Sequence, residues 1–195
     1  MDRRYFLIGL TTAFTFCAAP ILAITKAGAK KLVDSLVKDI NKVIASGKSQ
    51  KAMYSDFEKI FERYSDKSYI SAYAMGVDGR RATSAQKRAF SKAFQGYIAR
   101  KYGARFQEFI GGKLEVGSVK KVKSWYEVST TAYLRNEAPF DVTFQVSDRA
   151  GKNLFFNMYI EGVNLLLTER TEVGALVDRN GGSIDGMISD LKKAS

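Results

Sequence analysis

The chain after residue 23 begins with the hydrophobic spacing of helices. Apolar residues recur every three or four positions between residues 32 and 44, with lysines and aspartates between them. This spacing predicts an amphipathic helix that ends at Gly47. The same pattern predicts a second, short helix whose apolar face runs from Met53 to Tyr64, and a third over Tyr69–Ala74. The first part of the chain is therefore expected to be helical.

A longer helix is predicted to follow. Thr83 and Gln86 have the spacing of a capping box, in which a hydroxyl and an amide side chain satisfy free backbone N–H groups at a helix start. The helix is expected to run to about residue 109, before Gly111-Gly112 ends it. At 1.5 Å per residue it would span roughly 30–40 Å. Its wide apolar stripe includes Phe90, Phe94, Tyr97, Ile98, Tyr102 and Phe106.

Beyond these glycines the period of the apolar pattern changes from about 3.6 to 2, which predicts strands. Apolar and polar residues alternate from 140 to 147, and residues 125–134 are rich in β-forming side chains. A strand from Leu114 toward Val122 and another over Leu154–Ile160 complete a predicted four-stranded antiparallel meander. The apolar faces of the long helix and of this sheet are compatible with a dry core or with a cleft, because periodicity does not tell how closely two faces approach.

Two helices are predicted to end the chain, at residues 164–179 and at 184–193, the second capped by Ser183. Helices come first and the sheet follows, which is the order of an α+β protein. There are no repeats and no long Pro/Gly/Ser linker after residue 23. We therefore expect a single domain over residues 24–195.

The N-terminal residues have the order of parts of a secretory signal peptide. Arg3-Arg4 precede an apolar stretch from Tyr5 to Ala19, Pro20 interrupts it, and Ala23 offers a small residue for cleavage. Residues 1–23 are therefore expected to be a cleaved export signal, which places the mature protein in the periplasm.

This N-terminal segment has three interpretations. The paired arginines, followed by Tyr5-Phe6-Leu7, also fit a twin-arginine signal, as an alternative to the general secretory route. An uncleaved membrane anchor is a third reading of this segment, since residues 5–25 are nearly long enough to span a bilayer.

The composition removes most catalytic classes. The chain has no histidine, and its only cysteine, Cys17, lies in the predicted signal. Triads and dyads that use His or Cys, and zinc sites of the usual kind, are therefore excluded for the mature chain. An enzyme would need a Ser–Lys dyad or a carboxylate pair formed only in space. We expect a protein that is not an enzyme and that needs no cofactor or metal.

Basic residues exceed acidic ones. The chain has 31 Lys and Arg against 20 Asp and Glu, a net charge of +11, and removal of residues 1–23 leaves +10. Export argues against nucleic acid as the partner. Attraction to anionic membrane surfaces or acidic proteins, and plain solubility, both remain open. The excess is spread over four clusters, namely Lys30-Lys31, Arg80-Arg81, Lys120-Lys121-Lys123 and Lys192-Lys193.

The order of several motifs resembles the MlaC/toluene-tolerance family. Tyr73–Gly76 and Arg81–Phe90 look like the family's "LG…W(R)xATxxQ(R)xxF" segment. Ile160–Leu165 resembles its "(I/V)EGVSL" signature, and Arg170 stands at the arginine of its "YRxxF". Ile184–Leu191 is similar to its closing "GxDGLIxxLK". The likeness covers nearly all of the predicted mature chain.

This resemblance implies a fold and a function. The fold is an α+β domain in which N-terminal helices pack on a curved four-stranded antiparallel sheet and, with C-terminal helices, enclose a deep apolar pocket. The pocket would hold the acyl chains of a phospholipid as cargo. The implied partners are an inner-membrane ABC transporter complex with MCE-domain subunits, an outer-membrane lipoprotein–porin complex and, transiently, the membrane surface.

The sequence departs from the family's motifs at several positions. The motif tryptophans are lost, and the aspartate of "WKVxD" becomes Asn157. The signature serine becomes Asn164, and the "YRxxF" aromatics become Glu169 and Val173. Related family members are associated with hopanoid export, so a hopanoid or isoprenoid is an alternative cargo. A periplasmic adaptor with a filled core is the alternative to a carrier.

Two groups of site residues follow from this interpretation. Arg80, Arg81 and Lys87 are expected at the mouth or docking rim, with a solvated surface as the alternative for each. Glu161-Gly162 is expected to be structural, and Arg170 to pair with a nearby carboxylate. The expected lipid-binding residues, for which plain core packing is the alternative, are Tyr73, Phe90, Phe94, Tyr97, Tyr102, Phe106, Val142, Phe144 and Ile160.

Overall fold

The structure, a computed structural model, describes residues 23–105, 110–135 and 137–194. The helices before and after the sheet are the expected ones, and the class is α+β, as predicted. In chain order the elements are α1 (Lys26–Ile44), α2 (Gln50–Tyr64), α3 (Lys67–Met75), the 3₁₀ helix η1 (Gly76–Arg80), α4 (Ser84–Arg105), β1 (Lys113–Val122), β2 (Trp125–Tyr133), β3 (Phe140–Ser147), β4 (Leu154–Ile160), β5 (Val163–Asn164), α5 (Leu165–Arg179) and α6 (Ile184–Lys193).

The sheet is an antiparallel meander of five strands in the order β1-β2-β3-β4-β5, one more than predicted. The additional strand is the two-residue β5, which pairs with the end of β4 through a two-residue turn. Both turn residues have left-handed φ angles, +48° at Glu161 and +78° at Gly162. Gly162 thus permits a tight turn, as expected, but the chain passes into a short hairpin before the helix begins.

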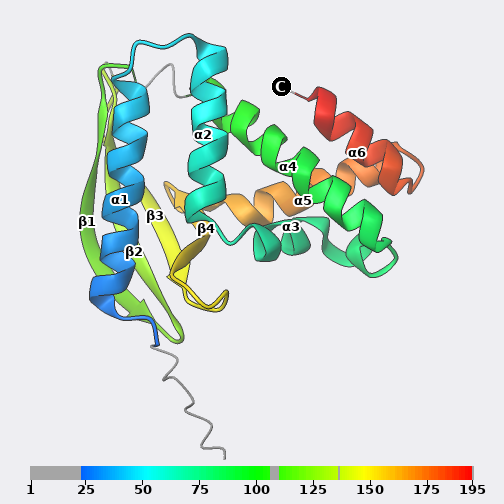
Figure 1. Ribbon diagram of the computed structural model, residues 1–195, viewed down its shortest axis with the longest axis horizontal. Coiled ribbons are helices and arrows are strands. Elements are labelled where there is room, and N and C mark those ends of the chain that lie inside the picture. The colour runs from blue at the N-terminus through cyan, green and yellow to red at the C-terminus, as the bar shows by residue number, and fades with distance from the viewer. Residues whose placement is uncertain (1–22, 106–109, 136, 195) are drawn as a thin grey trace, which may run out of the picture.

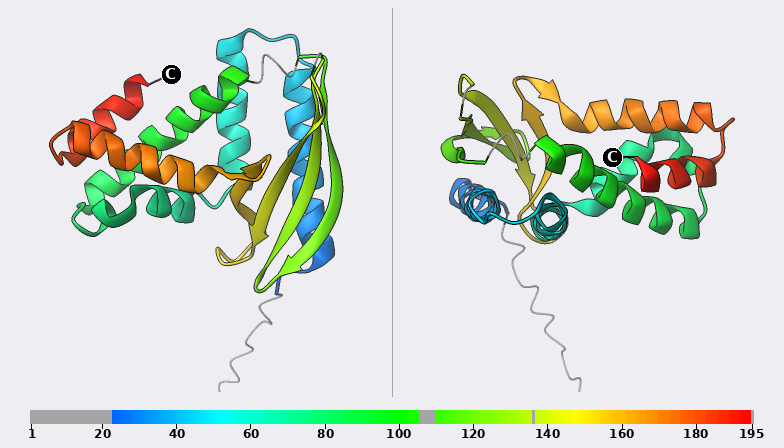
Figure 2. Two further views of the ribbon diagram at one scale, coloured as in Figure 1. Left: turned by 180° about the vertical axis from the view of Figure 1, so that it is seen from behind. Right: turned by 90° about the horizontal axis from the view of Figure 1, so that it is seen from above.

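The molecule has two parts that meet along β4 and α2 (Figure 1). In one part α1 lies along the sheet and contacts β1, β2 and β3, while α2 runs beside α1. In the other part α3, α4, α5 and α6 pack on one another away from the sheet. The view from above in Figure 2 shows α5 on one side of this helical part and α4 on the other.

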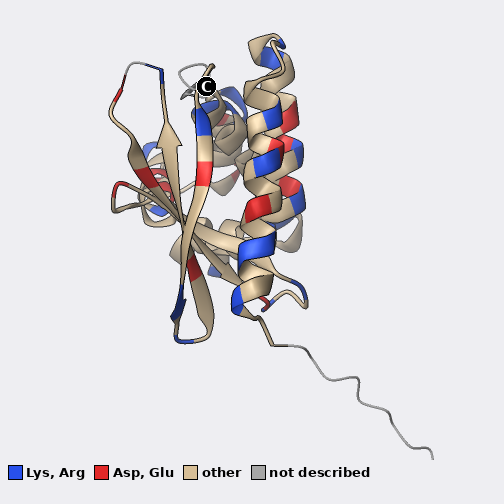
Figure 3. Ribbon diagram, turned by 90° about the vertical axis from the view of Figure 1, so that its left-hand side faces the viewer, with Lys and Arg blue, Asp and Glu red and all other residues tan. Residues whose placement is uncertain are grey.

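Helix α1 shows how the sequence directs this packing. Its buried side is the predicted apolar stripe, with Val33 and Leu36 at most 2% exposed. Thr25 caps the helix, since its Oγ1 accepts a hydrogen bond of 3.0 Å from the N–H of Gly28. Basic and acidic residues follow one another along the opposite side of α1 (Figure 3). The helix is therefore amphipathic in the sense that its sequence predicts.

The capping box at the start of α4 is present. The N–H of Gln86 donates to Thr83 Oγ1 at 3.2 Å, and the N–H of Thr83 donates to Gln86 Oε1 at 3.0 Å. The helix is described as far as Arg105, and the predicted end near residue 109 lies outside the described residues.

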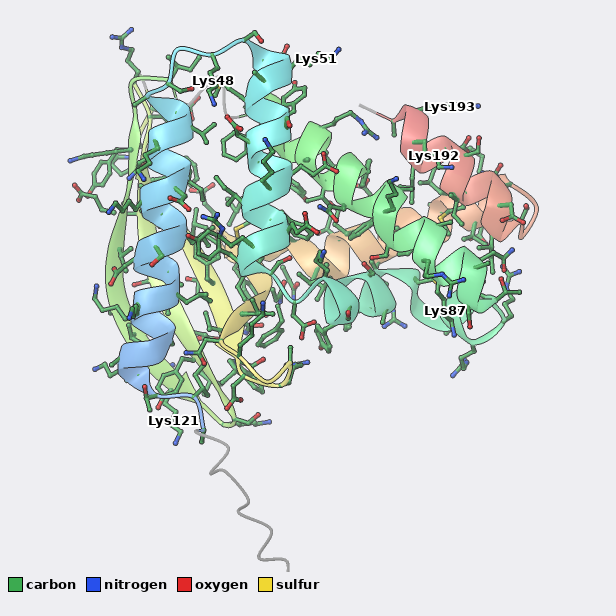
Figure 4. All side chains as sticks on the ribbon, in the orientation of Figure 1. Lys48, Lys51, Lys87, Lys121, Lys192 and Lys193 are labelled. Carbon is green, nitrogen blue, oxygen red and sulfur yellow. The ribbon has the colours of Figure 1, made fainter. Side chains whose placement is uncertain are left out.

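The described basic residues do not gather on one face. Figure 4 labels lysines at the α1–α2 connection, at the start of α2, at the start of α4, near the end of β1 and at the end of α6. The labelled residues are Lys48, Lys51, Lys87, Lys121, Lys192 and Lys193.

None of the helices in the described part of the chain is both long enough and apolar enough to cross a membrane.

Candidate functional site

An apolar cavity of about 310 Å³ lies where the sheet, the α1–α2 pair and the helical part meet. Its size falls at the lower end of ordinary ligand pockets. Helices α1, α2, α3, α4 and α5 contribute to its wall, as do β1, β3, β4 and the segment between β2 and β3. Most of the lining side chains are aliphatic or aromatic: Leu36, Ile40, Phe57, Ile60, Phe61, Ile70, Phe94, Ile98, Ala99, Leu114, Leu134, Phe140, Val142, Phe144, Phe155, Phe156, Met158, Ile160, Leu165 and Leu166.

Five of the nine residues expected to bind lipid line this cavity. Val142 and Phe144 point to the same face of β3 because they are two positions apart. Ile160 is the register partner of Val142 on β4, so the neighbouring strand extends this face. Phe94 and Tyr102 lie about two turns apart on α4 and face it from the helical part. That these five residues contact lipid remains a prediction.

Three other expected residues lie away from the cavity lining. The ring of Phe90, 1% exposed, stacks on Phe94 with centroids 5.3 Å apart. The hydroxyl of Tyr97 donates to Glu172 at 2.7 Å. Tyr73 packs between Tyr69 and the guanidinium of Arg170. These positions belong to the packing of the helical part, which was the stated alternative for each. The ninth residue, Phe106, lies outside the described residues.

Four aromatic residues of the cavity wall were not among the predicted lipid-binding residues. Phe57 and Phe61 line it from α2, and Phe155 and Phe156 line it from β4. Phe155 is central, since its ring meets Phe61 at 6.0 Å and Phe144 at 5.7 Å, both edge to face. The apolar stripe of α2 was visible in the sequence. The surface that this stripe packs against was not visible in the sequence, because it depends on how α2 and the sheet are placed relative to each other.

The polar side of the cavity is acidic. Glu137 and Glu161 are exposed, so the cavity reaches the surface at these residues. Glu169 also lines the cavity but is only 2% exposed. No lysine or arginine occurs among the lining residues that the structure describes. The charge at the cavity is thus opposite to the net charge of the chain.

A hydrogen-bonded cluster joins Glu169 to α4. Lys101 Nζ donates to Glu169 Oε1 at 2.9 Å and lies 2.7 Å from Glu172 Oε1. The hydroxyl of Tyr102 also donates to Glu169 Oε1. Burial, together with the neighbouring carboxylates, raises the pKa of Tyr97 and that of Tyr102, so both hydroxyls stay protonated donors.

The same cluster keeps its lysine and Glu172 ionised. Burial lowers the pKa of Lys101, but its hydrogen bonds to Glu172 and Glu169 outweigh that effect and raise the pKa overall. Burial raises the pKa of Glu172, and the hydrogen bonds from Lys101 and Tyr97 reverse this and lower it overall. The cluster therefore holds a positive charge between two glutamates.

Asn157 starts a second polar connection, inside the sheet. It is 7% exposed and lines the cavity. Its Nδ2 donates to Gln145 Oε1 at 3.2 Å, and Gln145 Nε2 donates to Glu127 at 3.0 Å. Asn157 Oδ1 accepts from the N–H groups of Met158 and Leu166. This amide chain ties β2, β3, β4 and the start of α5 together.

A sequence model of the "MlaC protein" family matches residues 30–193. The match includes every residue that lines the cavity, from Leu36 to Glu169. The chain belongs to the MlaC family.

A solved structure supports the same fold. It is the phospholipid-binding protein from Ralstonia solanacearum, in complex with a phospholipid. It is 17% identical to this MlaC-family chain, and the alignment covers 85% of this chain and 95% of that one, with a TM-score of 0.72. At this identity the likeness establishes the shared fold. The phospholipid belongs to the description of that protein.

Two departures from the MlaC motifs preserve local structure. Asn164, in place of the serine, caps α5 by accepting a 3.1 Å hydrogen bond from the N–H of Leu167. Asparagine and serine are comparably good at this position. Asn157, in place of the aspartate, keeps the acceptor for two backbone N–H groups and adds a donor for Gln145. A third departure, Glu169, introduces the buried carboxylate described above.

The carboxylate partner expected for Arg170 is not found among the described residues. Arg170 forms no ion pair with any described residue, and its guanidinium instead lies 5.1 Å from the ring centre of Tyr73. Arg80, Arg81 and Lys87 lie at the start of α4 or before it, and none lines the cavity. Lys87 is about 22 Å along the axis of α4 from Tyr102, at 1.5 Å per residue. A docking role for these three residues remains a prediction, at a distance from the cavity.

The described residues also contain no group of three or more Asp, Glu, His or Cys side chains placed to hold a metal ion.

Proposed function

We propose that this protein is a periplasmic carrier that holds the acyl chains of a phospholipid in the cavity between the sheet and the helical part. The observation that carries the proposal is the apolar cavity of about 310 Å³ on an MlaC-family fold. The phospholipid bound to the protein from Ralstonia solanacearum supports the same ligand class. This is a binding and transport role rather than an enzymatic one.

The energetics require a carrier that docks. Transfer of hydrocarbon from water to an apolar site is worth roughly 0.8 kcal/mol per CH₂. Two acyl chains with on the order of thirty methylenes would gain roughly 20–25 kcal/mol. Release into water would be very slow at such a cost, so the lipid must pass between apolar surfaces in contact. We propose that the protein docks on an inner-membrane ABC transporter complex and an outer-membrane lipoprotein–porin complex.

Two exposed apolar residues that adjoin lining residues support a docking edge. Val163 is 54% exposed and pairs in the β4–β5 hairpin with Ile160, which lines the cavity. Leu167 is 51% exposed and follows Leu166, another lining residue. In our proposal this edge contacts the partner complex. Residues 1–23 act as the export signal, and residues 24–195 form the single lipid-binding domain.

The experiment is extraction of the bound ligand. The full chain is expressed in a Gram-negative host, the exported protein is purified without detergent, and an organic extract is analysed by mass spectrometry. We expect about one phospholipid per protein. A hopanoid or isoprenoid would change the cargo and keep the carrier. A protein without lipid after gentle purification would overturn the proposal and favour an adaptor.

A further inference from the structure

Glu169 has an oxygen that nothing in the described part of the chain satisfies. Its Oε1 accepts hydrogen bonds from Lys101 and Tyr102, while its Oε2 is buried and has no hydrogen-bond partner among the described residues. The side chain is 2% exposed and lines the cavity. Buried carboxylate oxygens are almost always hydrogen-bonded, so this one requires an explanation.

The neighbouring donors are already used. The hydroxyl of Tyr97 donates to Glu172, and Lys101 is shared between Glu169 and Glu172. Asn157, the lining amide, donates through its Nδ2 to Gln145. No donor thus remains for Glu169 Oε2 among the described residues, and a ligand in the cavity could supply one.

The charge of the cavity restricts which chemical groups can be that donor. Glu137, Glu161 and Glu169 are the charged residues among the described lining, and all three are acidic. Lys101 is held between Glu169 and Glu172, so it offers the cavity no free cation. An anionic group placed against this wall would meet repulsion and no donor.

We infer that Glu169 makes the cavity selective for lipids that bring a hydrogen-bond donor, an ammonium or a hydroxyl group, to its inner wall, and against lipids that bring an anion there. The inference rests on the proposed lipid-binding function and adds its specificity. Glu169 acts as a specificity-determining residue, since its free oxygen accepts the hydrogen bond from the ligand.

Three single-chain probes of equal length test this inference. Hexadecylamine, hexadecanol and hexadecanoate compete, below their aggregation limits, with a phosphatidylethanolamine that carries a pyrenyl acyl chain. We expect hexadecanoate to need roughly a tenfold or higher concentration than the better of the other two, which corresponds to one hydrogen bond to a buried charge. If the amine displaces the probe best, the donor is an ammonium group, and if the alcohol does, it is a hydroxyl group.

Two variants separate the role of Glu169 from that of its neighbour. Glu169→Gln should reduce the difference between the probes to roughly threefold or less, because the amide is neutral and offers a donor of its own. Glu172→Gln is the control. Glu172 also binds Lys101 but does not line the cavity, so this variant should keep the difference between the probes. Melting temperatures verify that both variants fold.

The outcomes are distinguishable. If the wild-type protein does not bind the pyrenyl lipid, the proposed function fails and the inference fails with it. If the lipid binds and the three probes compete equally, or hexadecanoate competes best, only the inference is overturned. The three probes are compared on the wild-type protein, so the inference is tested even if the Glu169→Gln protein misfolds.

Discussion

At the residue scale, the buried amides of the sheet are the groups that the sequence least revealed. Asn157 and Gln145 lie on predicted strands, yet each is only 7% exposed. A polar residue inside a strand is expected to face solvent, and here the two amides satisfy each other instead. No sequence pattern pairs positions 145 and 157, since their register depends on the bulge between Gln145 and Val146.

This pairing predicts the effect of restoring the aspartate of the family motif. Asn157→Asp removes the Nδ2 donor, so that either Gln145 Oε1 or Glu127 loses its partner. We expect the free energy of unfolding at pH 7 to fall by about 1–3 kcal/mol, measured by urea denaturation. Asn153→Asp makes the same change at a half-buried position in the β3–β4 turn and should have a smaller effect. An unchanged urea midpoint for Asn157→Asp would contradict the role of the amide chain.

At the element scale, the sequence predicted most helices and strands because their apolar periods are clear. The α4 capping box, the α6 cap at Ser183 and the long strands are all present. Strand β5 was missed because two residues carry no period, and its pairing follows from the Glu161-Gly162 turn. The contact between α1 and α2 was also not predictable, since it depends on side chains 25 positions apart.

That contact makes stability depend on pH. Asp39 on α1 accepts hydrogen bonds from Tyr64 at 2.7 Å and Arg63 at 3.1 Å. The Tyr64 hydrogen bond lowers the pKa of Asp39 below its ordinary value of 3.8, and the charges of Lys42 and Arg63 add to this. A lowered folded-state pKa gives stability that is present above about pH 4 and is lost as the pH falls through the folded value.

Asp39→Asn should therefore destabilise the protein at pH 7, by on the order of 1 kcal/mol, and progressively less below pH 4. Urea midpoints at pH 7 and pH 3 measure the change. Asp34→Asn, whose carboxylate pairs with Lys30 on the same helix, serves as the control with a weaker effect. A destabilisation by Asp39→Asn that stayed constant from pH 7 to pH 3 would rule out this linkage.

At the scale of the whole molecule, the sequence could indicate apolar faces but not the space between them. Phe94 and Phe144 were assigned to inward faces and do line the cavity, whereas Phe90 has the same helical spacing and packs as ordinary core. The difference arises because α4 passes from the packed helical part to the junction with the sheet (Figure 1). One stripe thus serves as core at one end and as cavity wall at the other.

The central claim is that lipid occupies this junction, and the most direct test is to fill it. Ala99 is a small lining residue on α4, and Ala99→Phe places a ring in the cavity, while Ala175→Phe makes the same change on the exposed side of α5. The measurement is the amount of lipid extracted per folded protein, with melting temperatures as the check on folding. We predict that Ala99→Phe retains less than roughly a fifth of the lipid, a loss of about 1 kcal/mol or more in binding, while Ala175→Phe retains the wild-type amount. Full retention of lipid by a folded Ala99→Phe protein would contradict the account.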